Sequence, residues 1–331
     1  MRSSHALAGL SSHRILGEAY NRLPLSNVSN ARAIHEEKNQ IQSARPNLCR
    51  SRSVEKFSHK ECSFGDPSNP LDVTEYQHII WRSLCQNELS EKPISLRQDE
   101  IKSIDRGIAF DNMSHVHYRL GLGTNGLYIA YGIMDRYMSI KSLPKNKLKT
   151  YSCAALFIGS KVEDYHQPRI GDLIRMADHC FGENERSFSP KELYAAEIDL
   201  INTIGFEITF GTPLFYITQL MRISGQTQEL VLLARYIIEI MQTSDQFIGV
   251  KYSKQTAIAV MVTRILSGDS RWTNALAGYT TYSESDLYSY ALIVRNMLAD
   301  QNLISTRFMR RKYGTELFHC VSRVKIPSNF K

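Results

Sequence analysis

The stretch from Asn125 to Asp164 constrains the fold of this chain most strongly. It predicts two helices joined by a short turn that contains Pro144. The second helix mixes small residues with large apolar ones, so it is apolar almost all round and belongs in the middle of a helical bundle. It ends in the charged run Lys161–Asp164. Charges at the end of a buried helix need a partner or access to solvent.

The rest of the chain beyond residue 67 also predicts helices separated by short turns, and candidate strands are few and short. Asp72 and Glu75 have the spacing of an N-cap and its acidic partner, which predicts an N-terminal helix ending near Leu89. Ser189-Pro190 with Glu192 marks another helix start; Ser-Pro is also a minimal proline-directed phosphorylation site. The predicted class is all-α, with further helices at about 97–117, 124–139, 145–163, 168–178, 190–204, 213–222, 226–244, 253–267, 271–278 and 283–302.

A weak internal repeat divides the helical part. The hexapeptide that begins at Asp135 matches the one that begins at Asp245, at an offset of 110 residues. Each copy precedes a polar turn and a helix rich in small residues, which predicts two degenerate copies of one five-helix unit. The predicted organisation is a disordered tail (1–66), an N-terminal helix (67–93), two helical domains (94–210 and 211–306) and a basic C-terminal segment (307–331).

The net charge of +7 comes from the ends of the chain. Residues 1–66 carry a net charge of +4 and residues 307–331 carry +6, so the helical body is mildly acidic. Proteins that read nucleic acid more often have a basic stripe on the folded part, which argues against direct nucleic-acid binding. No run approaches the ~18 apolar residues of a membrane span. The six cysteines are scattered, as reduced thiols usually are.

No catalytic or metal-binding constellation is recognisable. The chain lacks the glycine-rich phosphate loops, the paired-histidine zinc motif and the nucleophile elbow of common enzyme classes. His115 and His117 are two residues apart and would not share a helix face. The expectation is therefore a protein that is not an enzyme and has no cofactor and no metal site.

Several segments carry a family resemblance: Pro70–Tyr76, Ile133–Ser139, Ser160–Asp164, Gly171–Leu173, Ala196-Glu197, Leu200–Phe206, Lys312-Tyr313 and Val321-Ser322. With these segments the chain resembles the cyclin family from residue 67 to about 325, most closely the B-type (mitotic) cyclins. Each segment is weak alone, but all occur in the family's order and at workable spacing. The resemblance implies two tandem cyclin boxes, no activity of the chain's own, and a role in binding and activating a cyclin-dependent kinase at the G2/mitosis transition.

The resemblance also implies a kinase-binding site in the first box. The family's essential lysine and glutamate align with Lys161 and Glu197, and the family surrounds them with an apolar pocket. Lysine offers three donors and glutamate only acceptors, so together they can hold partner groups of both polarities. On the residues alone, a Lys–Glu pair that only ties two helices together is the simpler interpretation. The pocket residues implied here are Ile158, Val162, Ile201, Phe206 and Ile208.

The chain departs from the family at its substrate-docking patch. Arg106, Ile108 and Asp111 match the family motif, whereas its Met, Leu and Trp align with Asp105, Ala109 and Asn112. The loss of apolar surface argues against docking of Arg-x-Leu substrates. Arg106 and Asp111 are expected to pair with each other and to brace the N-terminal helix.

The N-terminal tail contains a motif similar to the family's destruction box. Arg22, Leu25 and Asn30 fit Arg-x-x-Leu with Asn at the ninth position. An extended peptide can be recognised only where no fold hides it. The resemblance implies recognition by a ubiquitin ligase, degradation in each cell cycle, and a location in nucleus and cytoplasm; chance occurrence in a tail is the alternative.

Three alternatives share parts of this pattern. A transcription-type cyclin or a cyclin-fold transcription factor would have the same fold, although no cysteine pattern supports the zinc ribbon of the latter. The altered docking patch also fits a scaffold that acts without a kinase. An enzyme would need a catalytic set that the sequence does not display.

Overall fold

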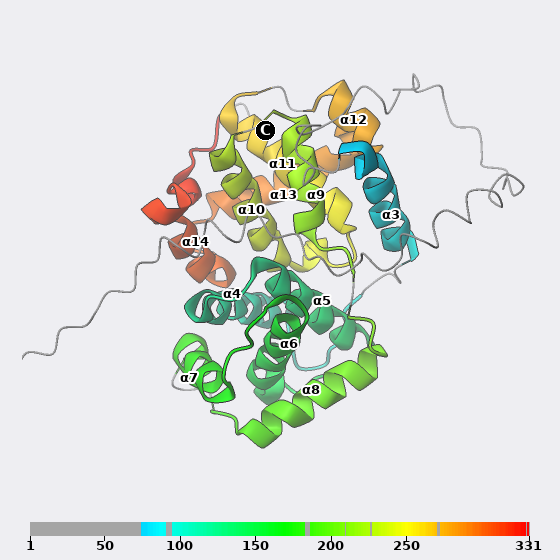
Figure 1. Ribbon diagram of the computed structural model, residues 1–331. Coiled ribbons are helices and arrows are strands. Elements are labelled where there is room, and N and C mark those ends of the chain that lie inside the picture. The colour runs from blue at the N-terminus through cyan, green and yellow to red at the C-terminus, as the bar shows by residue number, and fades with distance from the viewer. Residues whose placement is uncertain are drawn as a thin grey trace, which may run out of the picture. The chain divides into compact units, whose positions relative to one another are not determined.

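Helices form every regular element of the part of the chain that the structure describes (Figure 1). The computed structural model describes residues 74–90, 95–182, 186–208, 210–225, 227–269, 272–328 and 330, all within one unit, Phe57–Lys331. These residues contain twelve α-helices, several short 3-10 helices and no strand, which confirms the all-α prediction. No helix among them combines the length and apolar character needed to cross a membrane.

The first helical group is built around one buried helix. Its members are α4 (Ser103–Leu120), α5 (Thr124–Ile140), α6 (Leu148–Glu163), α7 (Ile170–Phe181) and α8 (Pro190–Ile204). Helix α6 is buried without interruption from Ser152 to Ser160, as its composition predicts. Gly126 and Gly159 let α5 and α6 approach closely, because a Cβ atom on Gly159 would collide with the carbonyl oxygen of Gly126.

The second group repeats this arrangement. It consists of α9 (Pro213–Ile223), α10 (Gln228–Gln242), α11 (Tyr252–Ser267), α12 (Asn274–Thr280) and α13 (Glu284–Ala299), which follow one another as α4–α8 do. Helix α11 is buried along most of its length, as α6 is in the first group. The two groups are therefore copies of one five-helix unit, in agreement with the repeat seen in the sequence.

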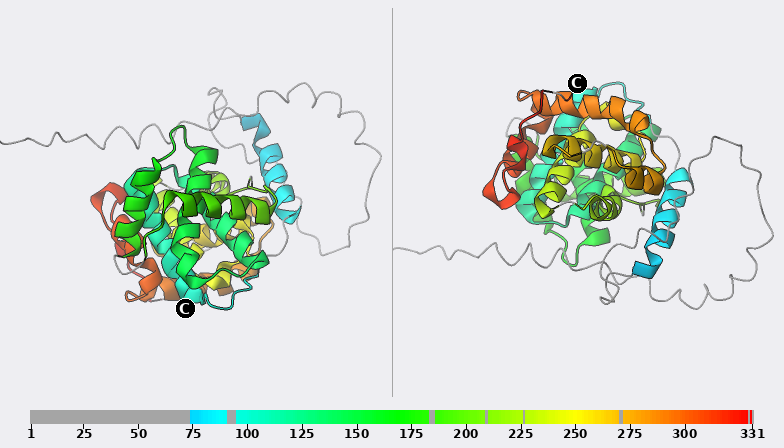
Figure 2. Two further views of the ribbon diagram at one scale, coloured as in Figure 1. Left: turned by 90° about the horizontal axis from the view of Figure 1, so that it is seen from below. Right: turned by 90° about the horizontal axis from the view of Figure 1, so that it is seen from above.

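The N-terminal helix α3 (Gln77–Ser90) packs on the second group (Figure 2). Trp81 is buried against Tyr216 of α9 and Tyr279 of α12, with ring centroids 5.4 and 4.6 Å away. Near the end of α3, Glu88 accepts a 2.6 Å hydrogen bond from the backbone N–H of Ser253, in the first turn of α11. An aromatic contact and a helix-terminal hydrogen bond thus fix α3 to the second repeat.

The start of α4 differs from the prediction. Residues 95–102 are not helical, although a helix was expected from about residue 97. Here the Gln98 side chain donates to the carbonyl oxygens of Met138 and Lys141 and accepts from the N–H of Leu143. These bonds join the segment to the turn after α5. The helix begins only after Lys102, whose backbone N–H donates to the Asp105 carboxylate at 3.0 Å.

The C-terminal segment, for which the sequence predicted only a basic character, is helical in part. It contains helix α14 (Arg307–Tyr313), and Lys312 within it is buried. Lys312 Nζ donates to both carboxylate oxygens of Glu239 on α10, at 2.8 and 2.9 Å, and the Tyr313 hydroxyl donates to the same carboxylate at 2.6 Å. Burial of a lysine requires such a partner, so the segment is part of the fold.

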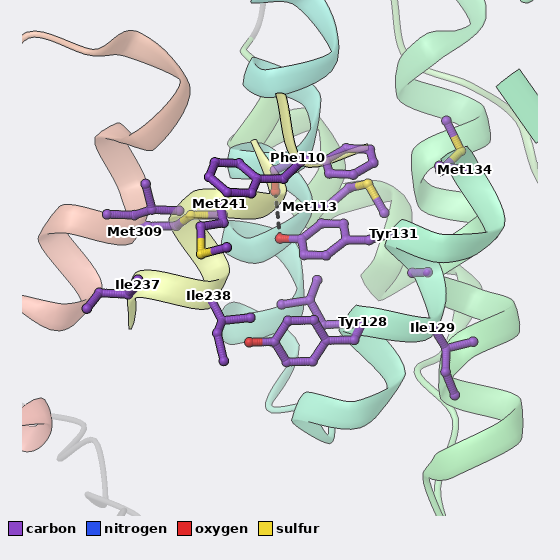
Figure 3. Close-up of a cluster of buried hydrophobic side chains, with 14 of the residues drawn as sticks. Phe110, Met113, Tyr128, Ile129, Tyr131, Met134, Ile237, Ile238, Met241 and Met309 are labelled. Atoms are coloured by element: carbon purple, nitrogen blue, oxygen red, sulfur yellow. Dashed lines mark hydrogen bonds between the residues drawn. The ribbon is translucent and has the colours of Figure 1, made fainter. Parts of the chain in front are cut away.

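The two groups share an apolar junction (Figure 3). Phe110 and Met113 of α4 meet Tyr131 of α5, and Met241 of α10 and Met309 of α14 lie beside them. The Phe110 and Tyr131 rings stack at 4.5 Å, and the Tyr131 hydroxyl donates to the Phe110 carbonyl at 3.1 Å. Because these side chains are fully buried, the junction is packed like the interior of either group.

Candidate functional site

Lys161 and Glu197 meet at the surface between α6 and α8. Lys161 lies in the last turn of α6 and Glu197 in the middle of α8. The Lys161 ammonium contacts Glu197 Oε1 and stands 4.2 Å from the centre of the Phe157 ring. The side chain of Lys161 is 40% exposed and that of Glu197 is 11% exposed. The ammonium therefore retains donors that can reach a partner.

The apolar residues expected around this pair divide into two sets. Phe206 is 69% exposed and Val162 is 37% exposed, while Ile201 and Ile208 are half-buried beside the core. Ile158 is only 2% exposed and belongs to the core. Four of the five side chains are thus available to a partner at the surface, and Ile158 supports them from below.

Helix α8 contributes two exposed apolar residues that the sequence analysis missed. Tyr194 and Ile198 are exposed, one helical turn apart, on either side of Glu197. The sequence could have indicated them, because this helix has apolar residues on two faces and only one face can pack on the core. The other face, with Leu193, Ala196, Leu200 and Ile204, is buried. An exposed apolar face beside an ion pair is typical of an interaction site. We call Lys161, Val162, Tyr194, Glu197, Ile198, Ile201, Phe206 and Ile208 the Lys161 surface.

The turn after α8 projects Phe206 outward. Gly205 has φ 70° and ends the helix, and the N–H of Phe206 returns to the carbonyl of Ile201 at 3.1 Å, as in a Schellman motif. Phe206 itself has φ 62°, a left-handed conformation that a bulky residue rarely adopts. Arg136 fixes the following segment by donating to the Glu207 carbonyl at 2.7 Å. Strain of this kind concentrates at functional sites.

A carboxylate network fixes α8 to α5 and α6. Asp199 accepts hydrogen bonds from Tyr137 at 2.7 Å, Tyr151 at 2.8 Å and Lys141 at 2.8 Å. Burial raises the pKa of Asp199, but the hydrogen bonds from Lys141 and the two tyrosines outweigh it and lower the pKa to about 2. The network therefore holds the helix that carries Glu197 in a defined position.

The residues of the altered docking patch do not interact as expected. Arg106 is buried and forms a bidentate pair with Asp135, with both bonds at 2.7 Å, and donates to the Gln242 carbonyl at 2.8 Å. Asp111 accepts from the N–H groups of Phe308 and Met309, at 2.7 and 3.0 Å. The expectation that Arg106 and Asp111 pair and brace the N-terminal helix was wrong, because Arg106 connects α4 and α5 to α10 and Asp111 caps α14.

The surface where the family has its apolar patch is polar in this chain. Asp105 forms a 2.7 Å ion pair with the exposed Lys145 and accepts from the Lys102 N–H at 3.0 Å. Ala109 is buried, Ile108 and Asn112 are only partly exposed, and Ile108 is the one large apolar side chain among the three. An apolar ligand would lose the hydration of the ion pair and gain little contact in return.

Neither the tail motif nor a metal site forms part of the described surface. Arg22, Leu25 and Asn30 of the tail motif lie outside the described residues. Among the residues that are described, no group of histidine, cysteine and carboxylate side chains is arranged to hold a metal ion.

Two family matches cover most of the chain. The cyclin N-terminal domain matches residues 76–209, and the cyclin C-terminal domain matches residues 211–327. The chain belongs to the cyclin family. The boundary between the two matches falls between α8 and α9, where the second copy of the five-helix unit follows the first.

Curated relatives of this cyclin include mitotic cyclins. The G2/mitotic-specific cyclin cdc13 of Schizosaccharomyces pombe is 27% identical over 256 residues, which are 76% of this chain and 51% of the relative. The putative cyclin-B3-1 of Arabidopsis thaliana is 28% identical over 230 residues, 68% of this chain and 56% of the relative. The aligned part therefore spans little more than half the length of these relatives.

Solved structures share the fold of this cyclin. A viral cyclin from herpesvirus saimiri matches with a TM-score of 0.60 at 16% identity, covering 68% of this chain and 99% of the viral protein. A chain of the yeast RNA polymerase II CTD kinase complex CTDK-1 matches with a TM-score of 0.52 at 11% identity, covering 76% of this chain and 91% of that one. At these identities the likeness concerns the fold.

Proposed function

We propose that this cyclin is a regulatory subunit that binds and activates a cyclin-dependent protein kinase through the Lys161 surface. The observation that carries the proposal is the position of the Lys161–Glu197 pair within a group of exposed apolar side chains. An exposed ion pair that only joined two helices would contribute little stability and would not need an apolar surround. Phe206 and Ile198 supply that surround, and at 69% and 61% they are the most exposed of its residues.

Activation on this proposal requires no chemistry from the cyclin. An active kinase has the glutamate of its C-helix paired with a strand lysine and its activation loop open. A partner that binds this arrangement more tightly than the inactive one shifts the kinase toward it. A 10⁴-fold preference would supply roughly 5.5 kcal/mol, enough to convert a mostly inactive population into a mostly active one. The Asp199 network supports this role because a rigid surface can discriminate between two shapes.

The double variant Lys161→Ala/Glu197→Ala tests the proposal. We expect it to lose binding and activation of the kinase while its stability changes by only about 1 kcal/mol, because the pair is partly exposed. Pull-down with candidate cyclin-dependent kinases, a histone kinase assay and urea unfolding measure the three quantities. The matched control is Asp172→Ala/Arg175→Ala, which removes an exposed ion pair on α7.

The possible outcomes separate the alternatives. Unchanged activation in the double variant would refute the proposed contact. Kinase that binds the unmodified protein but stays inactive would indicate a scaffold. No kinase in the pull-down would favour a cyclin-fold transcription factor.

We further propose that this cyclin acts at the G2/mitosis transition, in nucleus and cytoplasm, and that a ubiquitin ligase recognises its N-terminal tail. Relatives with mitotic names and the spacing of Arg22, Leu25 and Asn30 support this proposal. We expect Arg22→Ala/Leu25→Ala to keep the protein abundant after mitosis, since degradation would lose its signal. Immunoblots of synchronised cells measure this; the same fall in abundance in both forms would contradict it. Arg45, which starts an Arg-x-x-Leu without the Asn, provides the control Arg45→Ala.

A further inference from the structure

Four basic side chains come together where α4, α7 and α14 meet, away from the Lys161 surface. His115 and Arg119 are one turn apart on α4, His179 is on α7 and Arg311 is on α14. The two imidazole rings have centroids 6.0 Å apart. Arg119, His179 and Arg311 are exposed and His115 is half-buried. We call these four residues the basic cluster.

The helices that carry the basic cluster are held together by buried contacts. The His115 ring stacks on Phe308 of α14 with centroids 4.1 Å apart. One turn before His115, Asp111 accepts the backbone N–H groups that begin α14. The backbone that carries the cluster is therefore held in place, so little ordering of these helices is needed when a ligand binds.

Among the described residues, Asp111 is the carboxylate whose pKa, raised by burial, the charge of Arg311 acts to lower, and it is buried and already accepts two backbone N–H groups. Burial and then the positive charges of Arg311, His179 and Arg119 lower the pKa of His115 to about 4. Burial raises the pKa of the nearby Cys180 thiol, and the charges of Arg119 and Arg311 both act to lower it. Within the described part of the chain, neither arginine forms an ion pair or a side-chain hydrogen bond. By contrast, Arg175 and Arg186, which precede and follow His179 in the sequence, have carboxylate partners. Exposed cations gathered on one part of the surface favour binding of an anion.

We propose that the basic cluster is a docking site for a phosphorylated serine or threonine in an extended segment of a separate partner protein. Two guanidinium groups can each donate a pair of hydrogen bonds to phosphate oxygens, and the imidazoles add further donors. A phosphate monoester carries nearly two negative charges at neutral pH, which matches two arginines. A site of four basic side chains fits a single phosphate group better than the backbone of a nucleic acid, which carries a row of phosphates.

The charge of the chain favours a separate protein over its own tail as the source of the phosphate. Residues 1–66 carry a net charge of +4, so the cluster repels them unless several sites are phosphorylated. The surface where the family has its apolar docking patch is polar in this chain. The proposed phosphate site would let this cyclin choose targets without such a patch. It rests on α4, α7 and α14, and the proposed kinase contact rests on α6 and α8, so the two proposals can fail separately.

Fluorescence anisotropy on the full chain tests the proposal. The probes are a labelled ten-residue peptide with a central phosphothreonine, its unphosphorylated twin, and a single-stranded DNA 20-mer. We expect the phosphopeptide to bind at least ~10-fold more tightly than its twin, and Arg119→Gln/Arg311→Gln to abolish that difference. Arg82→Gln/Arg97→Gln removes the same charge from exposed positions on and after α3 and should leave it intact. Thermal unfolding checks that both double variants fold.

A second readout follows His115 itself. A bound phosphate would offset the positive charges around the imidazole, so the pKa of His115 should rise when inorganic phosphate is added, as NMR titration of the ring protons measures.

Three results would overturn the proposal. The two peptides could bind equally well, or the control variant could lose as much phosphopeptide binding as Arg119→Gln/Arg311→Gln does. The DNA could also bind more tightly than the phosphopeptide and lose its binding in Arg119→Gln/Arg311→Gln. A gain in phosphopeptide binding after phosphatase treatment of the cyclin would show that its own phosphorylated tail occupies the cluster, and would overturn the assignment to a separate partner.

Discussion

Arg106 shows how one side chain can connect distant parts of the chain. Its guanidinium binds both oxygens of Asp135 on α5 and the carbonyl of Gln242 at the end of α10, and its face lies 4.1 Å from the Phe110 ring. All its polar neighbours are buried, so loss of the guanidinium would leave the Asp135 charge without a partner. An exposed pair such as Asp105–Lys145 has water as a substitute.

At the residue scale we therefore expect Arg106→Ala and Lys145→Ala to differ sharply. Arg106→Ala should lower the free energy of unfolding by roughly 3–5 kcal/mol, because it breaks a buried pair and keeps one charge. Lys145→Ala should lower it by less than about 1 kcal/mol. Urea unfolding measures both. Similar losses for the two variants would mean that the buried pair is not an important source of stability.

At the scale of elements, the turn between α4 and α5 depends on a buried histidine. His117 Nε2 lies 2.9 Å from the Gly123 carbonyl, and the Gly123 N–H donates at 2.8 Å to Asp164, just after α6. Burial, followed by the charge of Lys312, lowers the pKa of His117 from 6.5 to about 4. The imidazole is consequently neutral in the folded protein at pH values where an unfolded chain would protonate it.

This shift predicts a pH dependence of stability. A base whose pKa is lowered by folding contributes stability above its unfolded value, and that stability is lost as pH falls from 6.5 through 4. His117→Gln keeps a donor for the Gly123 carbonyl but cannot be protonated. We expect its free energy of unfolding to fall less than that of the unmodified protein between pH 7 and 4, by about 3 kcal/mol. Urea unfolding across this range measures the difference, and the exposed His166 provides the control His166→Gln.

At the scale of the whole folded unit, α14 joins the two helical repeats. Its first turn is capped by Asp111 of the first repeat, and its last turn supplies Lys312 and Tyr313 to Glu239 of the second. Arg310, between them, donates to the carbonyls of Met297 and Asp300 at the end of α13. A short helix near the C-terminus thus satisfies polar groups on three other helices, and those of Asp111 and Glu239 are buried.

We expect Lys312→Met to destabilise the unit by roughly 3–5 kcal/mol, since Glu239 would stay buried without the cation that is hydrogen-bonded to it. Adding Glu239→Gln should restore much of the loss, because the neutral amide still accepts from Tyr313 and needs no cation. Chemical denaturation of the single and double variants forms a double-mutant cycle. Additive losses would show that Lys312 and Glu239 do not depend on each other.

The sequence by itself determined the class of fold and the repeat, and its resemblance to the cyclin family pointed to Lys161 and Glu197. Helical periodicity, capping residues such as Ser189 and small residues such as Gly159 are local signals, and local signals are sufficient where a helix buries a continuous face. The two apolar faces of α8 were also visible in the sequence, although the outward-facing Tyr194 and Ile198 were identified only from their exposure.

Only the tertiary structure decided which charges are partners. Arg106 lies 29 residues from Asp135, and Asp111 lies nearly 200 residues from the N–H groups that it caps, so no local pattern connects them. The sequence showed Lys312 only as part of a basic segment, because its carboxylate partner, Glu239, lies far away in the sequence on α10. The basic cluster likewise exists only because α4, α7 and α14 meet. Pairing of buried charges depends on distance in space, and that distance is set by how the helices pack.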